Sequence, residues 1–226
     1  MNVKVKKVLL WFLDLGINIA IIFGLVLIIQ KWFIAPFDVS GASMCNTLNY
    51  IDGECENSYG EKIIINEATY LFTSPQRGEI VVFKADEGED KYYIKRIIGL
   101  PGETVEVKNG NVYITEVGKT ESYTLLEEYL SPENKGNTKS YFKNFSVFNV
   151  PAEHYFVLGD NRQLSTDSRS CFNSYIAESC KNSPEKAYVS VDLIRGKAWI
   201  VWWPFSKIRL IDNPDYQATS ESLDEK

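Results

Sequence analysis

The longest apolar run of the chain lies near its N-terminus. Residues 8–30 are almost all hydrophobic, and a short stretch with Lys4, Lys6 and Lys7 precedes them. A helix of this length covers roughly 34 Å, enough to cross a bilayer core of about 30 Å. The run exceeds the apolar core of a cleavable signal peptide, and no small-residue cleavage site follows it. We therefore predict a transmembrane signal anchor over residues 8–30, and the positive-inside rule predicts that residues 1–7 are cytoplasmic.

Beyond residue 31 the apolar positions follow the period of strands, and no amphipathic helix of comparable strength is visible. In residues 104–115, Asn109-Gly110 predicts a type I′ turn between two short strands. This pattern predicts a mainly β, extracytoplasmic domain over residues 36–211, behind the N-terminal transmembrane helix. Further strands are predicted within residues 78–84, 92–100, 153–160 and 196–205.

Two stretches are polar and lack a clear period. Residues 116–146 contain "SPENKGN" and are predicted to form a surface excursion with one short ordered piece, "TLLEEYL". Residues 212–226 end in "QATSESLDEK" and are predicted to be disordered.

Composition narrows the classes of function. The net charge of −6 argues against a nucleic-acid binder, because no basic face dominates. The cysteines form two local pairs without CxxC spacing, and there is one histidine, so we expect no metal site and no cofactor. Outside the cytoplasm, each pair would form a short disulfide, and the alternative is four buried thiols. The pairs are Cys45 with Cys55 and Cys171 with Cys180.

The stretch "VSGASMCNTL" (39–48) is either a flexible linker or a tight turn that presents Ser43 for chemistry. A serine triad would need His154, which stands at the start of a predicted strand, where a histidine is more often an edge residue than a base. A lysine is then the candidate base, and it must be neutral, which burial among apolar side chains favours.

Lys95 meets this requirement better than the other lysines. It stands in "YYIKRIIGL", whereas most others lie in charged or polar loops. Strand alternation predicts that Arg96 points to the opposite face. The alternative is that Lys95 is an edge lysine whose ammonium reaches solvent.

The stretch "LGDNRQLSTDSR" (158–169) follows a predicted strand and is dense in groups that can bond one another. It is either a rigid polar platform, in which a hydroxyl such as that of Ser165 orients the lysine amine, or an ordinary solvated turn.

These three stretches, in this order behind an anchor, resemble the boxes of the type I signal peptidase (leader peptidase) family, which uses a Ser–Lys dyad. "SGASMCNTL" is similar to the serine box, "YYIKRIIGLPGETVEV" to the lysine box, and "GDNRQLSTDSR" to the third box. The resemblance covers roughly residues 37–211 plus the anchor, and three boxes in order are highly specific.

The resemblance implies a membrane-bound serine endopeptidase that removes N-terminal signal peptides from exported precursors. It implies that Ser43 is the nucleophile, that Lys95 is the general base and that Ser165 bonds the lysine. The residues that brace the site are then Asp160, Arg162, Asp167 and Arg169. The residues that bind the substrate are then Val39, Gly41, Ala42, Tyr93 and Ile94.

Two positions qualify the resemblance. Some members add a serine hydroxyl to the oxyanion hole at the position of Gly41, so this chain resembles the members with glycine there. The usual proline after the nucleophile is Asn46 here, and a Cys45–Cys55 bridge could restore rigidity to the turn.

The implied enzyme is a single-pass protein of the cytoplasmic membrane, and we expect a monomer whose partners are precursor proteins and the lipid bilayer. One or more aromatic side chains of "WIVWWPF" (199–205) are candidates for lipid contact, although a core strand is the plainer interpretation. The alternative function is an inactive or peptide-binding membrane-anchored β module. An autoprotease of the SOS-repressor type fits less well, because a membrane anchor stands where its DNA-binding domain would be. A tethered adhesin or sensor domain also fits less well, because it has no need of a lysine within an apolar strand.

Overall fold

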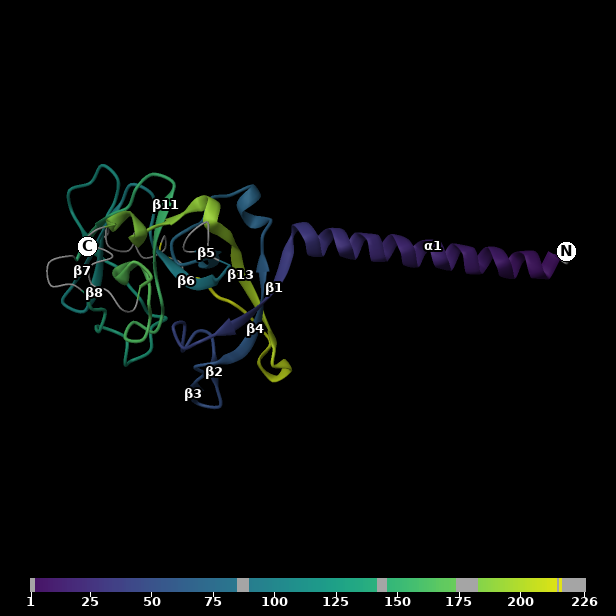
Figure 1. The fold of residues 1–226 in the computed structure, drawn as a ribbon, viewed down its shortest axis with the longest axis horizontal. Coiled ribbons are helices and arrows are strands. Elements are labelled where there is room, and N and C mark those ends of the chain that lie inside the picture. The colour runs from purple at the N-terminus through teal and green to yellow at the C-terminus, as the bar shows by residue number, and fades with distance from the viewer. Residues whose placement is uncertain (1–2, 85–89, 142–145, 174–182, 215, 217–226) are drawn as a thin grey trace, which may run out of the picture.

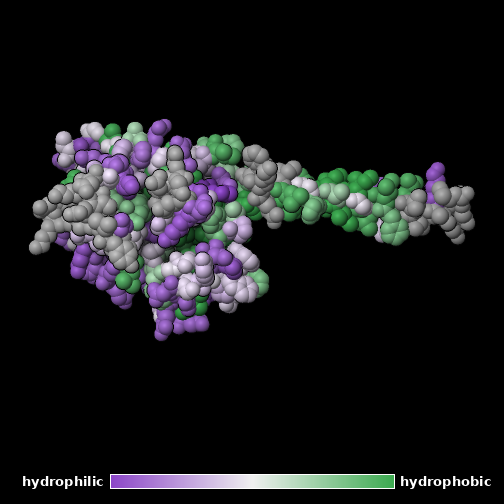
Figure 2. Space-filling view, viewed as in Figure 1, coloured by the Kyte–Doolittle hydropathy of each residue, from purple (hydrophilic) through white to green (hydrophobic). Residues whose placement is uncertain are grey.

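The computed structural model describes residues 3–84, 90–141, 146–173, 183–214 and 216. One long helix, α1 (Val3–Trp32), projects from a body made mainly of strands (Figure 1). The window Leu10–Leu27 is long and apolar enough to cross a membrane, and no part of it is buried against the rest of the protein. Figure 2 shows apolar side chains over the visible face of this helix. The predicted anchor therefore lies within α1.

The body is built on an antiparallel sheet with the strand order β1-β4-β13-β5-β6-β11-β12, and β14 also pairs with β13. The predicted strands 78–84, 92–100, 153–160 and 196–205 correspond to β5, β6, β11 and β13, so the mainly β fold is confirmed. The strands are β1 (Ile34–Ser40), β4 (Tyr59–Asn66), β5 (Ile80–Lys84), β6 (Tyr92–Gly99), β11 (His154–Leu158), β12 (Val189–Ser190), β13 (Ile194–Trp203) and β14 (Arg209–Leu210).

A second sheet has the order β10-β7-β8-β9, and β2 pairs with β3 in a small hairpin. Asn109 and Gly110 join β7 to β8 with positive φ at both residues, as a type I′ turn requires, so the predicted hairpin is confirmed. The strands are β7 (Thr104–Lys108), β8 (Asn111–Thr115), β9 (Tyr123–Thr124), β10 (Val147–Asn149), β2 (Tyr50–Ile51) and β3 (Glu54–Cys55). The short 3-10 turns are η1 (Thr69–Leu71), η2 (Ser168–Ser170), η3 (Pro184–Ala187), η4 (Val191–Leu193) and η5 (Phe205–Lys207).

The sequence patterns missed β1 and β4, which pair with each other beside the end of α1. β4 buries every second side chain, Glu61, Ile63 and Ile65, so its alternation was a signal that could have found it. β1 carries Pro36, which hides the strand pattern and is tolerated because β1 lies at the edge of the sheet.

The polar excursion and the tail pack more closely than expected. In the excursion, the side chains of Leu125, Glu127 and Thr138 are buried. In the tail, Tyr216 packs against the core cluster between the two larger sheets. The rest of the predicted tail, at 215 and 217–226, lies outside the described residues. Leu125 and Tyr216 belong to or pack against that core cluster, and Glu127 pairs with Arg162 of the loop after β11.

Candidate active site

Ser43 lies in the turn that follows β1. Gly41 enters the turn with a φ of 83°, a left-handed conformation that glycine adopts without strain. Met44 and Leu48 then anchor the turn, since both are buried in the cluster between β1, β4, β5 and β13. Successive backbone bonds from Cys45 to Ala42 and from Thr47 to Met44 tighten it. The stretch 39–48 is therefore a tight turn rather than a flexible linker.

Lys95 lies on β6 with only 3% of its surface exposed. Its Nζ is 2.8 Å from Ser43 Oγ, and it also donates to the carbonyl of Ile94 at 2.8 Å. Burial lowers the pKa of Lys95 to about 8, and the charge of Lys91 acts in the same direction, while Asp167 and Asp160 oppose it. A substantial part of this amine is therefore neutral, and able to act as a base, from about pH 7 upward, where an exposed lysine is almost wholly charged.

Asp160 joins the loop after β11 to the turn that carries Ser43 and to β6, which carries Lys95. It accepts from Arg96 Nε at 2.9 Å and Nη2 at 2.6 Å, and from Thr47 Oγ1 at 2.5 Å. The next residue, Asn161, donates its N–H to the carbonyl of Ser43 at 3.0 Å. The serine turn and the lysine strand are thus held to one loop. Arg96 was not predicted as a site residue; it is 1% exposed, and a charge within an apolar strand was the signal that it needs a buried partner.

Asp167 and Arg169 brace the same loop from within. Arg169 donates from Nε and Nη2 to the Asp167 carboxylate at 2.8 Å each, and Gly159 N–H donates to it at 3.1 Å. Burial alone would raise the pKa of Asp167, but the Arg169 guanidinium and these hydrogen bonds hold it below its usual range. Asp167 therefore stays ionised beside the buried lysine.

Arg162 pairs with a residue that the sequence patterns missed. Its guanidinium binds the Glu127 carboxylate through both Nη atoms, and Nη1 also donates to Thr138 Oγ1 at 2.7 Å. Glu127 stands in "TLLEEYL" near the buried Leu125 and Leu130, and an acid in such a run was the available signal. The third box is therefore a rigid platform rather than a solvated turn.

Ser165 differs from its expected role. Its side chain is buried, and its hydroxyl acts on the Asp167 carboxylate, whose pKa it helps to lower, and not on Lys95 Nζ. The second acceptor of Lys95 Nζ is the Ile94 carbonyl instead. The loop brings Ser165 against Gly159, close to the backbone of Ser43, without the predicted hydrogen bond to the lysine.

The predicted substrate residues line one groove of about 370 Å³ that also contains Ser43 and Lys95. The groove runs between β1, an edge strand, and the first half of β6. β11 pairs with the second half of β6, from Arg96 to Gly99, and no other described strand pairs with that edge of the first half. The predicted residues on the groove are Val39, Gly41, Ala42, Tyr93 and Ile94.

The cysteines behave as predicted where they are described. A disulfide joins Cys45 and Cys55, with 5.8 Å between their Cα atoms. In the second predicted pair, Cys171 is described and Cys180 lies outside the described residues. Within the described ranges, no group of three or more His, Cys, Asp or Glu side chains could hold a metal ion.

Comparison with known proteins identifies relatives of this arrangement. Signal peptidase IB of Staphylococcus aureus (strain COL) is 31% identical over 217 residues, which cover 93% of this chain and 97% of that protein. Signal peptidase I P of Bacillus subtilis subsp. natto is 33% identical over 210 residues, which cover 91% of this chain and 96% of that protein. The crystal structure of a signal peptidase I from Enterococcus faecalis V583 is 31% identical, covers 55% of this chain and 97% of that chain, and has a TM-score of 0.37. The family model described as signal peptidase, peptidase S26, matches residues 12–203, so this chain belongs to that family.

Proposed function

We propose that this chain is a membrane-anchored serine endopeptidase that removes signal peptides from exported precursor proteins, with Ser43 as nucleophile and Lys95 as general base. The observation that carries the proposal is the separation of 2.8 Å between Lys95 Nζ and Ser43 Oγ, at an amine whose burial lowers its pKa to about 8. A serine hydroxyl needs a base at this distance, and a neutral lysine supplies it without a histidine.

The reaction proceeds in two stages. Lys95 takes the proton of Ser43 Oγ as this oxygen attacks the scissile carbonyl carbon. Backbone N–H groups of the serine turn stabilise the negative oxygen that forms. Lys95 then gives its proton to the leaving amine, the mature protein departs, and the signal peptide stays as an ester on Ser43. A water molecule gives a proton to Lys95 as it attacks this ester, and Lys95 returns that proton to Ser43 Oγ as the signal peptide leaves with a new C-terminal carboxyl group.

The groove supports binding of an extended peptide. A strand placed in it can form main-chain hydrogen bonds with the edge of β1 and with the open half of β6. The side chains that line the groove beside Ser43 include Val39, Ala42 and Ile94. In this proposal affinity comes from the peptide backbone, and these side chains select small residues next to the cleaved bond.

The exposed apolar side chains support contact between the body and a bilayer. Phe205 is 67% exposed beside Trp203, which is 41% exposed, and Phe72 is 84% exposed next to Leu71 in the η1 turn. η1 follows β4, which pairs with β1 directly beyond the end of α1. Water penalises such side chains and a lipid interface favours aromatic ones.

The proposed topology follows from charge. The lysines before the anchor place residues 1–7 in the cytoplasm and the body on the extracytoplasmic side, where precursor cleavage sites emerge. We propose a monomer, and the net charge of −6 gives no reason to expect nucleic-acid binding.

The test is cleavage of a purified precursor by the full chain in lipid vesicles. Wild-type protein should release the signal peptide, whereas Ser43→Ala and Lys95→Ala should insert and fold but leave the precursor intact. His154→Gln is the control, because His154 lies at the far end of β11 and its Nδ1 lies 2.8 Å from the Ala152 carbonyl. Normal cleavage by Lys95→Ala would refute the assignment of the base, and peptide binding without cleavage by the wild type would favour the inactive binding module.

A further inference from the structure

The loop 159–169 carries the residues that brace the site, and it is held from two sides. On the catalytic side, Asp160 contacts Arg96 and Thr47, and Asn161 contacts Ser43. These contacts involve only the first residues of the loop. The remainder, which contains Ser165, needs support from elsewhere.

The other side of the loop lies against residues 123–141, here called the flanking segment. Arg162 is fully buried and binds Glu127, Thr138 Oγ1 and, at 3.1 Å, the Tyr129 hydroxyl. Gln163 Nε2 donates to the Glu133 carbonyl at 2.7 Å. A buried guanidinium needs such partners, because a lost partner leaves an uncompensated charge. The flanking segment therefore supplies the partners that the buried Arg162 of the loop needs.

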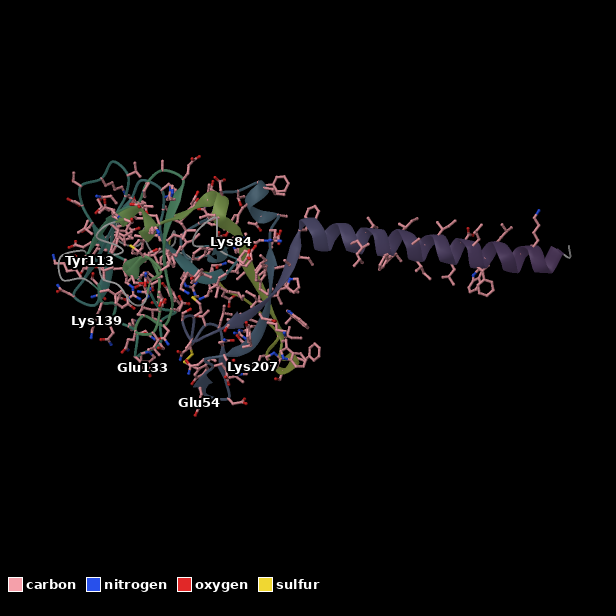
Figure 3. The ribbon with its side chains drawn as sticks, viewed as in Figure 1. Glu54, Lys84, Tyr113, Glu133, Lys139 and Lys207 are labelled. Carbon is pink, nitrogen blue, oxygen red and sulfur yellow. A yellow bond between two sulfur atoms is a disulfide. The ribbon has the colours of Figure 1, made fainter. Side chains whose placement is uncertain are left out.

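Arg169 and Ser165 also contact the flanking segment. Arg169 Nη1 donates to the Lys139 carbonyl at 3.0 Å, and Tyr141 lies with its ring 5.1 Å from the Arg169 guanidinium. The Tyr141 hydroxyl donates to the Ser165 carbonyl at 2.7 Å. Figure 3 labels Glu133 and Lys139, which lie in the part of the body away from α1. The contacts thus run along the whole outer side of the loop.

Displacement of Ser165 would also disturb the backbone contacts of Ser43, the proposed nucleophile. Ser165 Oγ and the Ser43 carbonyl oxygen both pack against Gly159, where they leave no room for a Cβ atom. Asp167, two residues after Ser165, accepts the Gly159 N–H. A shift at Ser165 must therefore move the backbone that carries Asp160, Asn161 and the bond to Ser43.

From these contacts we propose that the flanking segment is a positioning element for the catalytic loop, and that Tyr141 is a positioning residue whose hydroxyl holds Ser165 against Gly159 and so keeps the Ser43–Lys95 pair aligned. The inference rests on the proposed function of that pair. Tyr141 does not line the groove, although Leu164 and Thr166 on either side of Ser165 do, so Tyr141 should act more on alignment than on peptide binding.

The test compares Tyr141→Phe with Tyr113→Phe in the full chain. Each removes one hydroxyl, but Tyr113 (labelled in Figure 3) lies on β8, which pairs with β7 and β9. In Tyr141→Phe, kcat should fall about three- to tenfold, as the loss of one hydrogen bond allows, with a smaller change in KM. The acidic limb of the rate profile should move to higher pH, because a looser loop admits water to Lys95. Hydrogen exchange at residues 159–169 should also accelerate, and Tyr113→Phe should match the wild type.

An unchanged kcat, acidic limb and exchange rate in Tyr141→Phe would overturn the inference. The inference would also be overturned if activity fell only as much as the amount of folded protein and the acidic limb of the rate profile did not move. Such a result would indicate a purely structural role for Tyr141. A third outcome is that the wild type cleaves no precursor while the loop still exchanges faster in Tyr141→Phe than in the wild type. That result would support the positioning contact and would refute only the proposed function.

Discussion

Acidification should inactivate this enzyme by protonating Lys95, well before the protein unfolds. Burial lowers the pKa of Lys95 to about 8, so the amine is half neutral at about pH 8 and loses its neutral form as the pH falls. The neutral fraction is about 9% at pH 7 and about 1% at pH 6, so kcat/KM should fall about tenfold per pH unit on the acidic side.

The magnitude depends on the buried position of the amine. A lysine with its ordinary pKa of 10.5 would be only about 0.3% neutral at pH 8, so the burial of Lys95 increases the available base by about 150-fold there. Because the folded pKa lies below the unfolded one, the unfolded chain binds one more proton between about pH 8 and 10.5, and stability rises with pH across this window. Below about pH 8 this contribution is constant, so the acidic limb of the rate is not a loss of folded protein.

The assay is the initial rate of precursor cleavage in lipid vesicles at constant ionic strength, with folded protein followed in parallel by circular dichroism. Wild type and His154→Gln should share one acidic limb with a midpoint near the pKa of Lys95. If His154→Gln instead removed the limb and most of the activity, the base would be the histidine and the serine–lysine reasoning would be wrong. A midpoint near that of an exposed lysine would show that Lys95 is solvated in the working enzyme.

Two further predictions concern the support of the site. Glu127→Gln should lower the free energy of unfolding by about 3 kcal/mol, because Arg162 keeps a buried charge without its anionic partner; denaturant titration measures this, and an unchanged midpoint would contradict the buried pair. Cys45→Ser should cost roughly 2–3 kcal/mol, because the disulfide to Cys55 closes a short loop in the unfolded chain. Thermal unfolding with and without reductant checks this, since reductant should weaken the wild type and have a smaller effect on the variant.

Local patterns sufficed for much of the fold, whereas the proposed roles of Ser43 and Lys95 came from the resemblance to a family. An apolar run long enough to cross a bilayer, a two-residue period and an Asn-Gly turn are properties of neighbouring residues, so the anchor, β5, β6 and the β7–β8 hairpin could be predicted. Lys95 could be selected among the lysines because its neighbours in the chain are apolar. β1 was harder to predict, because Pro36 interrupts a strand whose pairing partner, β4, comes later in the chain.

Contacts between residues far apart in sequence depended on the folded sheet. Asp160 lies 64 positions from Arg96, and Glu127 lies 35 from Arg162, so no local pattern links these partners. Each buried ion needs a counter-ion because desolvation is costly, but only the packing of strands and loops determines which acid lies within reach. The same holds for Ser165, whose motif was recognised in the sequence, while the fold directs its carbonyl toward Tyr141 and leaves the Ile94 carbonyl as the acceptor for Lys95.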